Sequence, residues 1–173
     1  MSNKMTMSTK EISEVLNKAL EIELEGRKFY LECMAKTNHA GGQEMFRYLA
    51  QEEWIHYETV EKIYRREFEK EYLAFKKAQT AKEPASGIFP KKVPGGNVDK
   101  KSDALDALNI AIKAEDNSVL LYQRLAGGSK NEKLKKVFTK LAEEERKHFL
   151  ILENEVESVT QTGAYSDFKI VTT

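Results

Sequence analysis

The sequence repeats itself at an offset of 92 residues. Glu53 and His56, three positions apart, return as Glu145 and His148. Neighbouring residues return at the same offset, so this is more than the recurrence of a short motif. They are Phe46 and Phe138, Leu49 and Leu141, Ala50 and Ala142, and Glu52 and Glu144. The apolar members have helical spacing, which predicts one helix occurring twice with the same polar pair.

The repeat includes the helix that precedes each pair. The further matches are Ala19 and Ala111, Glu23 and Glu115, and Tyr30 and Tyr122. At 100° per residue, Glu23 and Glu115 fall within apolar stripes, as do Glu53 and Glu145. Each half is therefore predicted to be a helical hairpin. Its first helix carries one inward-facing Glu and its second carries Glu-x-x-His.

Periodicity and end signals predict four helices, at about residues 8–37, 43–80, 102–126 and 130–160. Ser8 with Glu11, and Ser129 with Glu132, have the spacing of a capping box. Glycine pairs mark the predicted turn at residues 38–42 and the predicted helix end at residues 127–128.

All three prolines lie between the second and third predicted helices, so residues 81–101 are expected to be an irregular crossover. Fully extended, this segment could span about 65 Å. A helix of about 27 residues is only about 40 Å long. The crossover can therefore run the length of the molecule and join the hairpins into an all-α, antiparallel four-helix bundle. The 173 residues fit a single domain, residues 1–173.

Composition excludes several kinds of partner. Lys plus Arg and Asp plus Glu each total 28, so no excess charge favours nucleic acid or an anionic membrane. The single cysteine, Cys33, cannot form an internal disulfide or a tetrathiolate site, and is predicted to be a core thiol. No apolar run has membrane length and the first residues lack an apolar segment, so we expect a cytoplasmic protein.

Four inward carboxylates require compensation, because each buried unpaired ion costs several kcal/mol. Two divalent cations would cancel their charge, with imidazoles as neutral ligands. Residues three apart share a helix face, so the Glu and His of each motif can reach one metal. Oxygen and imidazole ligands suit iron, with manganese as the other option. The predicted ligands are Glu23, Glu53, His56, Glu115, Glu145 and His148.

This ligand pattern is typical of ferritin-like di-iron and di-manganese bundles. Ala-x-x-x-Glu-x-x-x-x-x-x-Tyr at 19–30 and 111–122, with Glu-Glu-x-x-His at 52–56 and 144–148, resembles the rubrerythrin family over about residues 8–160. The resemblance implies a ferritin-like fold and a non-haem di-iron centre. It also implies reduction of hydrogen peroxide by ferrous iron, as a defence against oxidative stress. In that family reading, Glu53 and Glu145 bridge the metals and the other two glutamates are terminal ligands.

Two features depart from the family pattern. Rubrerythrins typically carry a rubredoxin module with four cysteines, so with Cys33 alone the electrons are expected from a separate rubredoxin-like donor. They also usually carry a further Glu one turn after the third-helix ligand. Here that position is Ser118, and its repeat partner is Gly26. The alternative is a ferroxidase or iron-storage protein of the bacterioferritin type, which oxidises Fe(II) with oxygen or peroxide.

The remaining residues of interest leave two readings open. Tyr30 and Tyr122, about 10 Å along the helix from the nearest ligand, are either hydrogen-bond donors to the site or core aromatics. Glu52 and Glu144 either orient ligands of the neighbouring helix or are surface charges.

Other positions carry weaker expectations. Trp54 is expected in packing or an oligomer contact, and His39 in a solvated turn. An apolar helix face left over would make the molecule a homodimer. No role is predicted for residues 161–173.

Overall fold

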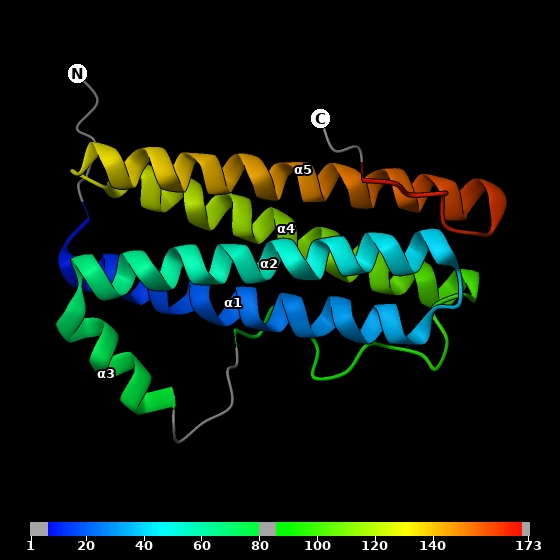
Figure 1. Ribbon diagram of the computed structural model, residues 1–173, viewed down its shortest axis with the longest axis horizontal. Helices are drawn as coiled ribbons and strands as arrows, with labels where there is room; N and C mark the ends of the chain where they lie inside the picture. Colours follow the sequence, from blue (N-terminus) through cyan, green and yellow to red (C-terminus); the bar gives the residue numbers. More distant parts are fainter. Residues whose placement is uncertain (1–6, 80–85, 171–173) are drawn as a thin grey trace.

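The computed structural model describes residues 7–79 and 86–170, which form five helices and no strands. These are α1 (Thr9–Lys36), α2 (Ala40–Glu67), α3 (Glu69–Gln79), α4 (Lys101–Gly128) and α5 (Glu132–Thr162). The long helices α1, α2, α4 and α5 lie side by side, and α3 lies outside them (Figure 1). The predicted all-α bundle of two hairpins is confirmed. None of the described helices combines the length and apolar character needed to cross a membrane.

The two hairpins are α1 with α2 and α4 with α5, and most contacts between helices lie within a hairpin. Between the hairpins, α1 and α4 pack more closely than α2 and α5 do. The described part of the crossover, residues 86–100, runs along α1 to the start of α4 (Figure 1). Residues 80–85 lie outside the described part of the chain.

Carboxylates and an ammonium on α1 hold the crossover in place. Glu25 accepts from the Ser86 backbone N–H at 2.7 Å, and Glu32 accepts from that of Val93 at 3.1 Å. The Lys36 ammonium donates to the Val93 carbonyl at 2.9 Å. These contacts place Phe89 against Phe29, with ring centroids 5.1 Å apart.

The apolar core consists of two clusters near opposite ends of the bundle. One includes Leu16, Tyr64 and Phe138, and the other includes Phe46 and Leu108. Cys33 is buried in the second cluster, as predicted.

The predicted length of the second helix is wrong. It was expected to reach residue 80, which lies outside the described residues, but α2 ends at Glu67 and α3 begins at Glu69. Phe68 at the bend has φ −140° and ψ 51°, and its N–H still bonds the Tyr64 carbonyl. The bend allows Tyr72 and Phe75 to pack on Tyr64, with ring centroids 5.6 and 6.1 Å away. Continuing straight would have carried both rings away from it.

The start of α2 also differs from the prediction, because Gly41 and Gly42 lie inside the helix rather than in a turn. A Cβ on Gly41 would lie 1.9 Å from the Ser166 carbonyl oxygen, and one on Gly42 would lie 2.9 Å from the Tyr165 ring. The glycines therefore make room for the C-terminal segment. His39 is the N-cap of α2, where its Nδ1 accepts from the Gly42 N–H at 3.3 Å, so it is not merely solvated.

The caps of the other helices follow the prediction in one case only. Ser8 and Glu11 form the predicted capping box of α1. The N-cap of α5 is Asn131 instead of Ser129, and its side chain accepts from the Lys133 and Leu134 N–H groups. The predicted α4 end at residues 127–128 is also too early, because both glycines are helical.

The segment after α5 packs against the bundle as far as it is described, to residue 170. Buried Glu155 accepts from the Ser166 N–H at 2.9 Å. The Tyr165 hydroxyl donates to the Val98 carbonyl at 2.9 Å. Residues 163–170 thus tie α5 to the crossover. The last three residues lie outside the described part.

Candidate metal centre

All six predicted ligands lie in the middle of the bundle, between the two apolar clusters. Glu23 comes from α1, Glu115 from α4, and each Glu-x-x-His pair from α2 or α5. None of their side chains is more than 4 % exposed: Glu23, Glu53, His56, Glu115, Glu145 and His148. A charged residue is almost never buried this deeply without a partner, so the cluster is the candidate functional site of the molecule.

The imidazoles present Nδ1 to the carboxylates. His56 Nδ1 lies 3.2 Å from Glu145 Oε1 and 3.7 Å from Glu23 Oε2. His148 Nδ1 lies 3.2 Å from Glu145 Oε2 and 3.6 Å from both Glu53 Oε1 and Glu115 Oε2. Glu145 therefore reaches both histidines, one with each oxygen. The geometry forms two groups, one around each imidazole.

The donor set fits metal ions. Ligand atoms of Glu53, His56, Glu145 and His148 all lie within 4.8 Å of one another. Several buried polar atoms of the six residues have no hydrogen-bond partner within the described chain: Glu23 Oε2, Glu53 Oε1, Glu145 Oε2, His56 Nε2 and His148 Nδ1. A buried polar atom without a partner is costly, and bound cations would satisfy the oxygens and Nδ1. The cluster could therefore hold metal ions.

The pKa shifts show that these buried carboxylates repel one another. Burial, together with the carboxylates of Glu23 and Glu115, raises the pKa of Glu145 to about 7. Burial and the same two neighbours also raise the pKa of Glu53 well above its usual value. Without a cation, protons would have to balance the carboxylates.

The pKa values of the two histidines are raised as well, because carboxylates surround them. Burial acts to lower the pKa of His56, but Glu145 and Glu144 outweigh it and the pKa is raised. His148 behaves alike, with its pKa raised well above the usual value despite burial. Burial would raise the pKa of Glu115, but the His148 imidazole 3.6 Å away lowers it overall.

Two tyrosines link the hairpins at the centre. The Tyr30 hydroxyl on α1 donates to Glu115 on α4, and the Tyr122 hydroxyl on α4 donates to Glu23 on α1. Both phenols are fully buried. Of the two readings the sequence left open, the structure favours hydrogen bonding to the site, while the rings still pack in the core.

Gly26 has a specific reason to be small. A Cβ there would lie 2.7 Å from Glu53 Oε2 and 3.4 Å from the Phe89 ring. The residue that crowds it is thus a predicted ligand, covered by the crossover. Ser118, its repeat partner on α4, is also buried.

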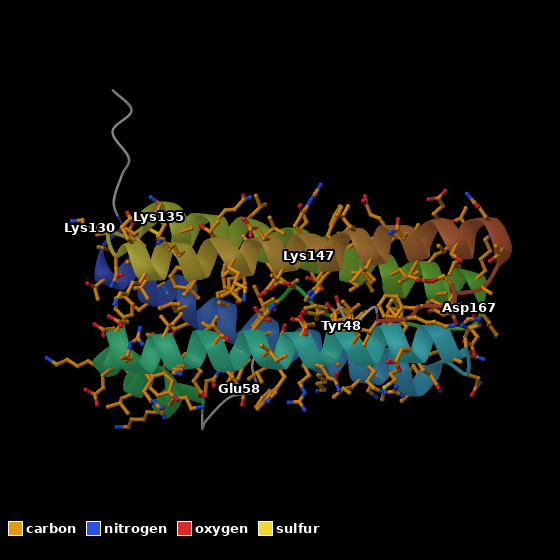
Figure 2. The ribbon with its side chains drawn as sticks, turned by 45° about the horizontal axis from the view of Figure 1, so that its top comes forward. Tyr48, Glu58, Lys130, Lys135, Lys147 and Asp167 are labelled. Atoms are coloured by element: carbon orange, nitrogen blue, oxygen red, sulfur yellow. The ribbon has the colours of Figure 1, made fainter. Side chains whose placement is uncertain are left out.

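Sequence reasoning missed Tyr48, which has no counterpart in the repeat. Its ring meets that of His148 edge-on, with centroids 6.1 Å apart at 85°. Figure 2 shows Tyr48 between α2 and α5. Trp54 stacks on Tyr57, with ring centroids 5.3 Å apart, which agrees with the packing role that was one of its two predicted roles.

Comparisons with known proteins agree with this architecture. The family model described as Rubrerythrin matches residues 14–92 and 106–169. A solved structure of a hypothetical protein from Pyrococcus furiosus superposes with a TM-score of 0.70 at 27% identity. The match covers 87% of this chain and 90% of that one. No curated protein sequence gave a significant match. Because the family model spans most of the chain, including all six central residues, the protein belongs to the rubrerythrin family.

Proposed function

We propose that the protein is a non-haem di-iron oxidoreductase that reduces hydrogen peroxide to water. The observation that carries the proposal is the buried set of four carboxylates and two imidazoles with unpartnered atoms facing one another. When bound, a pair of ferrous ions would supply the two electrons that cleave the O–O bond. Oxygen and nitrogen ligands without a thiolate favour iron or manganese over softer metals.

The side chains divide into two ligand groups. Following the family pattern, His56 with Glu23 would hold one ion and His148 with Glu115 would hold the other; these pairs lie 3.7 and 3.6 Å apart. Glu145, which reaches both imidazoles, would be shared. The family pattern gives the same role to Glu53, which lies 3.6 Å from His148. The two Tyr hydroxyls fix the terminal carboxylates from the opposite hairpin.

The protein would also exclude bulk water from the centre. The six ligand side chains are almost completely buried, and the crossover places Phe89 over Gly26 beside Glu53. A small neutral molecule such as hydrogen peroxide can enter such a site at lower cost than a charged one, because it loses less hydration. The electrons would come from a donor outside these 173 residues, such as a rubredoxin-like protein.

The second candidate is a ferroxidase that oxidises incoming Fe(II) with oxygen or peroxide. Ser118 favours it, because the rubrerythrin pattern usually has a ligating glutamate at this position. Without a glutamate at that position, the six-residue ligand set resembles bacterioferritin centres equally well.

Reoxidation kinetics separate the two functions. The protein is purified and loaded with iron anaerobically, reduced, and mixed with peroxide or with oxygen, with and without excess Fe(II). The proposal predicts fast reoxidation by peroxide, slower reoxidation by oxygen, and no retention of added iron. Oxidation and retention of many Fe(II) ions per chain would instead establish the ferroxidase. An iron-loaded centre that neither oxidant reoxidises would contradict both.

A further inference from the structure

The two halves of the centre differ on the side of each histidine that faces away from the carboxylates. His56 Nε2 lies 3.3 Å from Oε2 of Glu144 on α5. The other oxygen of Glu144, Oε1, lies 3.5 Å from the Lys140 ammonium one turn earlier on the same helix. The Glu144 side chain is 25 % exposed, so it connects a buried imidazole to a cation at the surface.

The repeat-related half lacks this arrangement. Glu52 occupies the position that corresponds to Glu144, yet no hydrogen bond or ion pair joins it to His148 within the described residues. The position of Lys140 is taken by Tyr48, whose ring packs against His148 edge-on. Phe168 from the C-terminal segment covers the same tyrosine, with centroids 5.9 Å apart. Within the described residues this half therefore has no ion pair between a carboxylate and the outer nitrogen of His148, and no lysine at the position of Lys140.

The outer nitrogen matters for metal binding. An imidazole that binds metal through Nδ1 carries its proton on Nε2, and ligating histidines usually donate that proton to a carboxylate or carbonyl. His56 is 1 % exposed, so bulk water is not an alternative acceptor. Its Nε2 makes no hydrogen bond in the present geometry, although Glu144 lies within 3.3 Å. A small rotation of either side chain would align the pair.

We propose that Glu144 is a positioning residue for His56 and makes the two metal positions unequal. By accepting the Nε2 proton it holds Nδ1 toward Glu23 and Glu145 and increases the basicity of the ring. The position at His56 then binds its ion more tightly than the position at His148. This inference rests on the proposed metal centre.

Cobalt(II) titration tests it, with Glu144→Gln compared with its repeat-matched control Glu52→Gln. Under anaerobic conditions the wild-type protein should take up two Co(II) ions in two resolved steps, followed by visible absorption. Glu144→Gln should weaken the tighter step by about 10–100-fold. Glu52→Gln should leave both steps unchanged. Far-UV circular dichroism verifies that both variants keep their helices.

A second readout depends on the hydrogen bond itself. In the Co(II)-loaded protein, exchangeable imidazole N–H protons give strongly shifted NMR signals. Glu144→Gln should move or broaden one of them, and Glu52→Gln should move neither. Equal effects of the two substitutions, or wild-type binding by Glu144→Gln, would overturn the inference and leave the metal centre standing. A wild-type protein that binds no Co(II) would remove the metal centre and the inference together.

Discussion

At the scale of single residues, Tyr30 and Tyr122 join the two hairpins through the centre. Each hydroxyl donates to a buried glutamate of the opposite hairpin. A carboxylate in an apolar environment is stabilised by such a donor, because the hydrogen bond replaces part of its lost hydration. The two tyrosines thus orient Glu23 and Glu115 and link the two hairpins.

Tyr122→Phe should lower the free energy of unfolding of the metal-free protein by about 1–3 kcal/mol, because buried Glu23 loses a donor. Tyr57→Phe is the control, since its hydroxyl donates to Glu61, which is only partly buried. Urea unfolding at neutral pH measures both changes. Equal losses of unfolding free energy in the two variants would show that the buried hydrogen bond to Glu23 stabilises the fold no more than the partly buried one to Glu61.

The pH dependence of stability should change sign with metal. The pKa of Glu145 is about 7 in the folded chain, against an ordinary 4.5, so the folded state binds more protons between these values. The raised pKa values of Glu53, His56 and His148 act in the same direction. Stability of the metal-free protein should therefore fall as pH rises from about 5 to 8.

With saturating Mn(II) the trend should reverse, because ligands must lose protons to bind metal and affinity then rises with pH. Urea midpoints at pH 5.5 and 7.5, with and without Mn(II), measure both slopes. Parallel slopes in the two series would contradict metal binding by these groups.

That these six side chains meet in the middle of the bundle could be predicted from the sequence, because each position recurs at an offset of 92 residues. The partners of the ligands could not. Whether Tyr30 meets Glu115 depends on how far α4 is shifted along α1, and that register is set by packing between hairpins. The cap role of His39 could not be predicted for a similar reason, since its bond to the Gly42 N–H depends on where the helix begins.

At the scale of elements, α1 and the crossover form a wall beside the centre. Gly26 lets Glu53 occupy its place, and Phe89 covers the gap. The crossover keeps this position because side chains of α1 bind its backbone at several points. Helix and crossover therefore act together on one predicted ligand.

Gly26→Ala should displace Glu53 and weaken metal binding by at least about tenfold, because the new Cβ would lie 2.7 Å from Oε2. Gly127→Ala is the matched control, because nothing lies within 4 Å of its Cβ position in α4. The control should be as stable as the wild type or slightly more stable. Competition against a metal chelator gives the affinities. Unchanged affinity in Gly26→Ala would show that Glu53 does not bind the metal in this position.

Lys36→Met should release the crossover, because its ammonium bonds the Val93 and Gly95 carbonyls and Glu32. The expected loss is about 1–3 kcal/mol of unfolding free energy, with faster proteolysis within residues 86–98. Lys28→Met on the same helix is the control, since Lys28 is exposed. Equal proteolysis of the two variants would show that Lys36 does not hold the crossover in place.

Element lengths were predictable where a chemical signal marks the end, as with the Ser8 capping box. No Pro or Gly next to Phe68 indicates the break between α2 and α3. It arises because aromatic residues of α3 gain contacts with Tyr64 by folding back. Likewise, Gly41 on its own indicates a turn, whereas a glycine is needed there because the Ser166 carbonyl, distant in the sequence, packs against it.

At the scale of the whole molecule, a polar centre divides the apolar core into two clusters. Burying four carboxylates there is costly in the absence of cations, and two divalent ions would remove the charge imbalance. The duplicated hairpin would give each ion a Glu and a His from the repeat. We therefore expect two metal ions to bind to each chain.

The direct measurement is iron per chain after anaerobic loading and removal of unbound metal. The wild type should retain two ions per chain and lose thermal stability when a chelator removes them. Glu53→Gln combined with Glu145→Gln should retain fewer than one. A wild-type protein that retains no stoichiometric metal, or a double variant that still binds two ions, would contradict the claim.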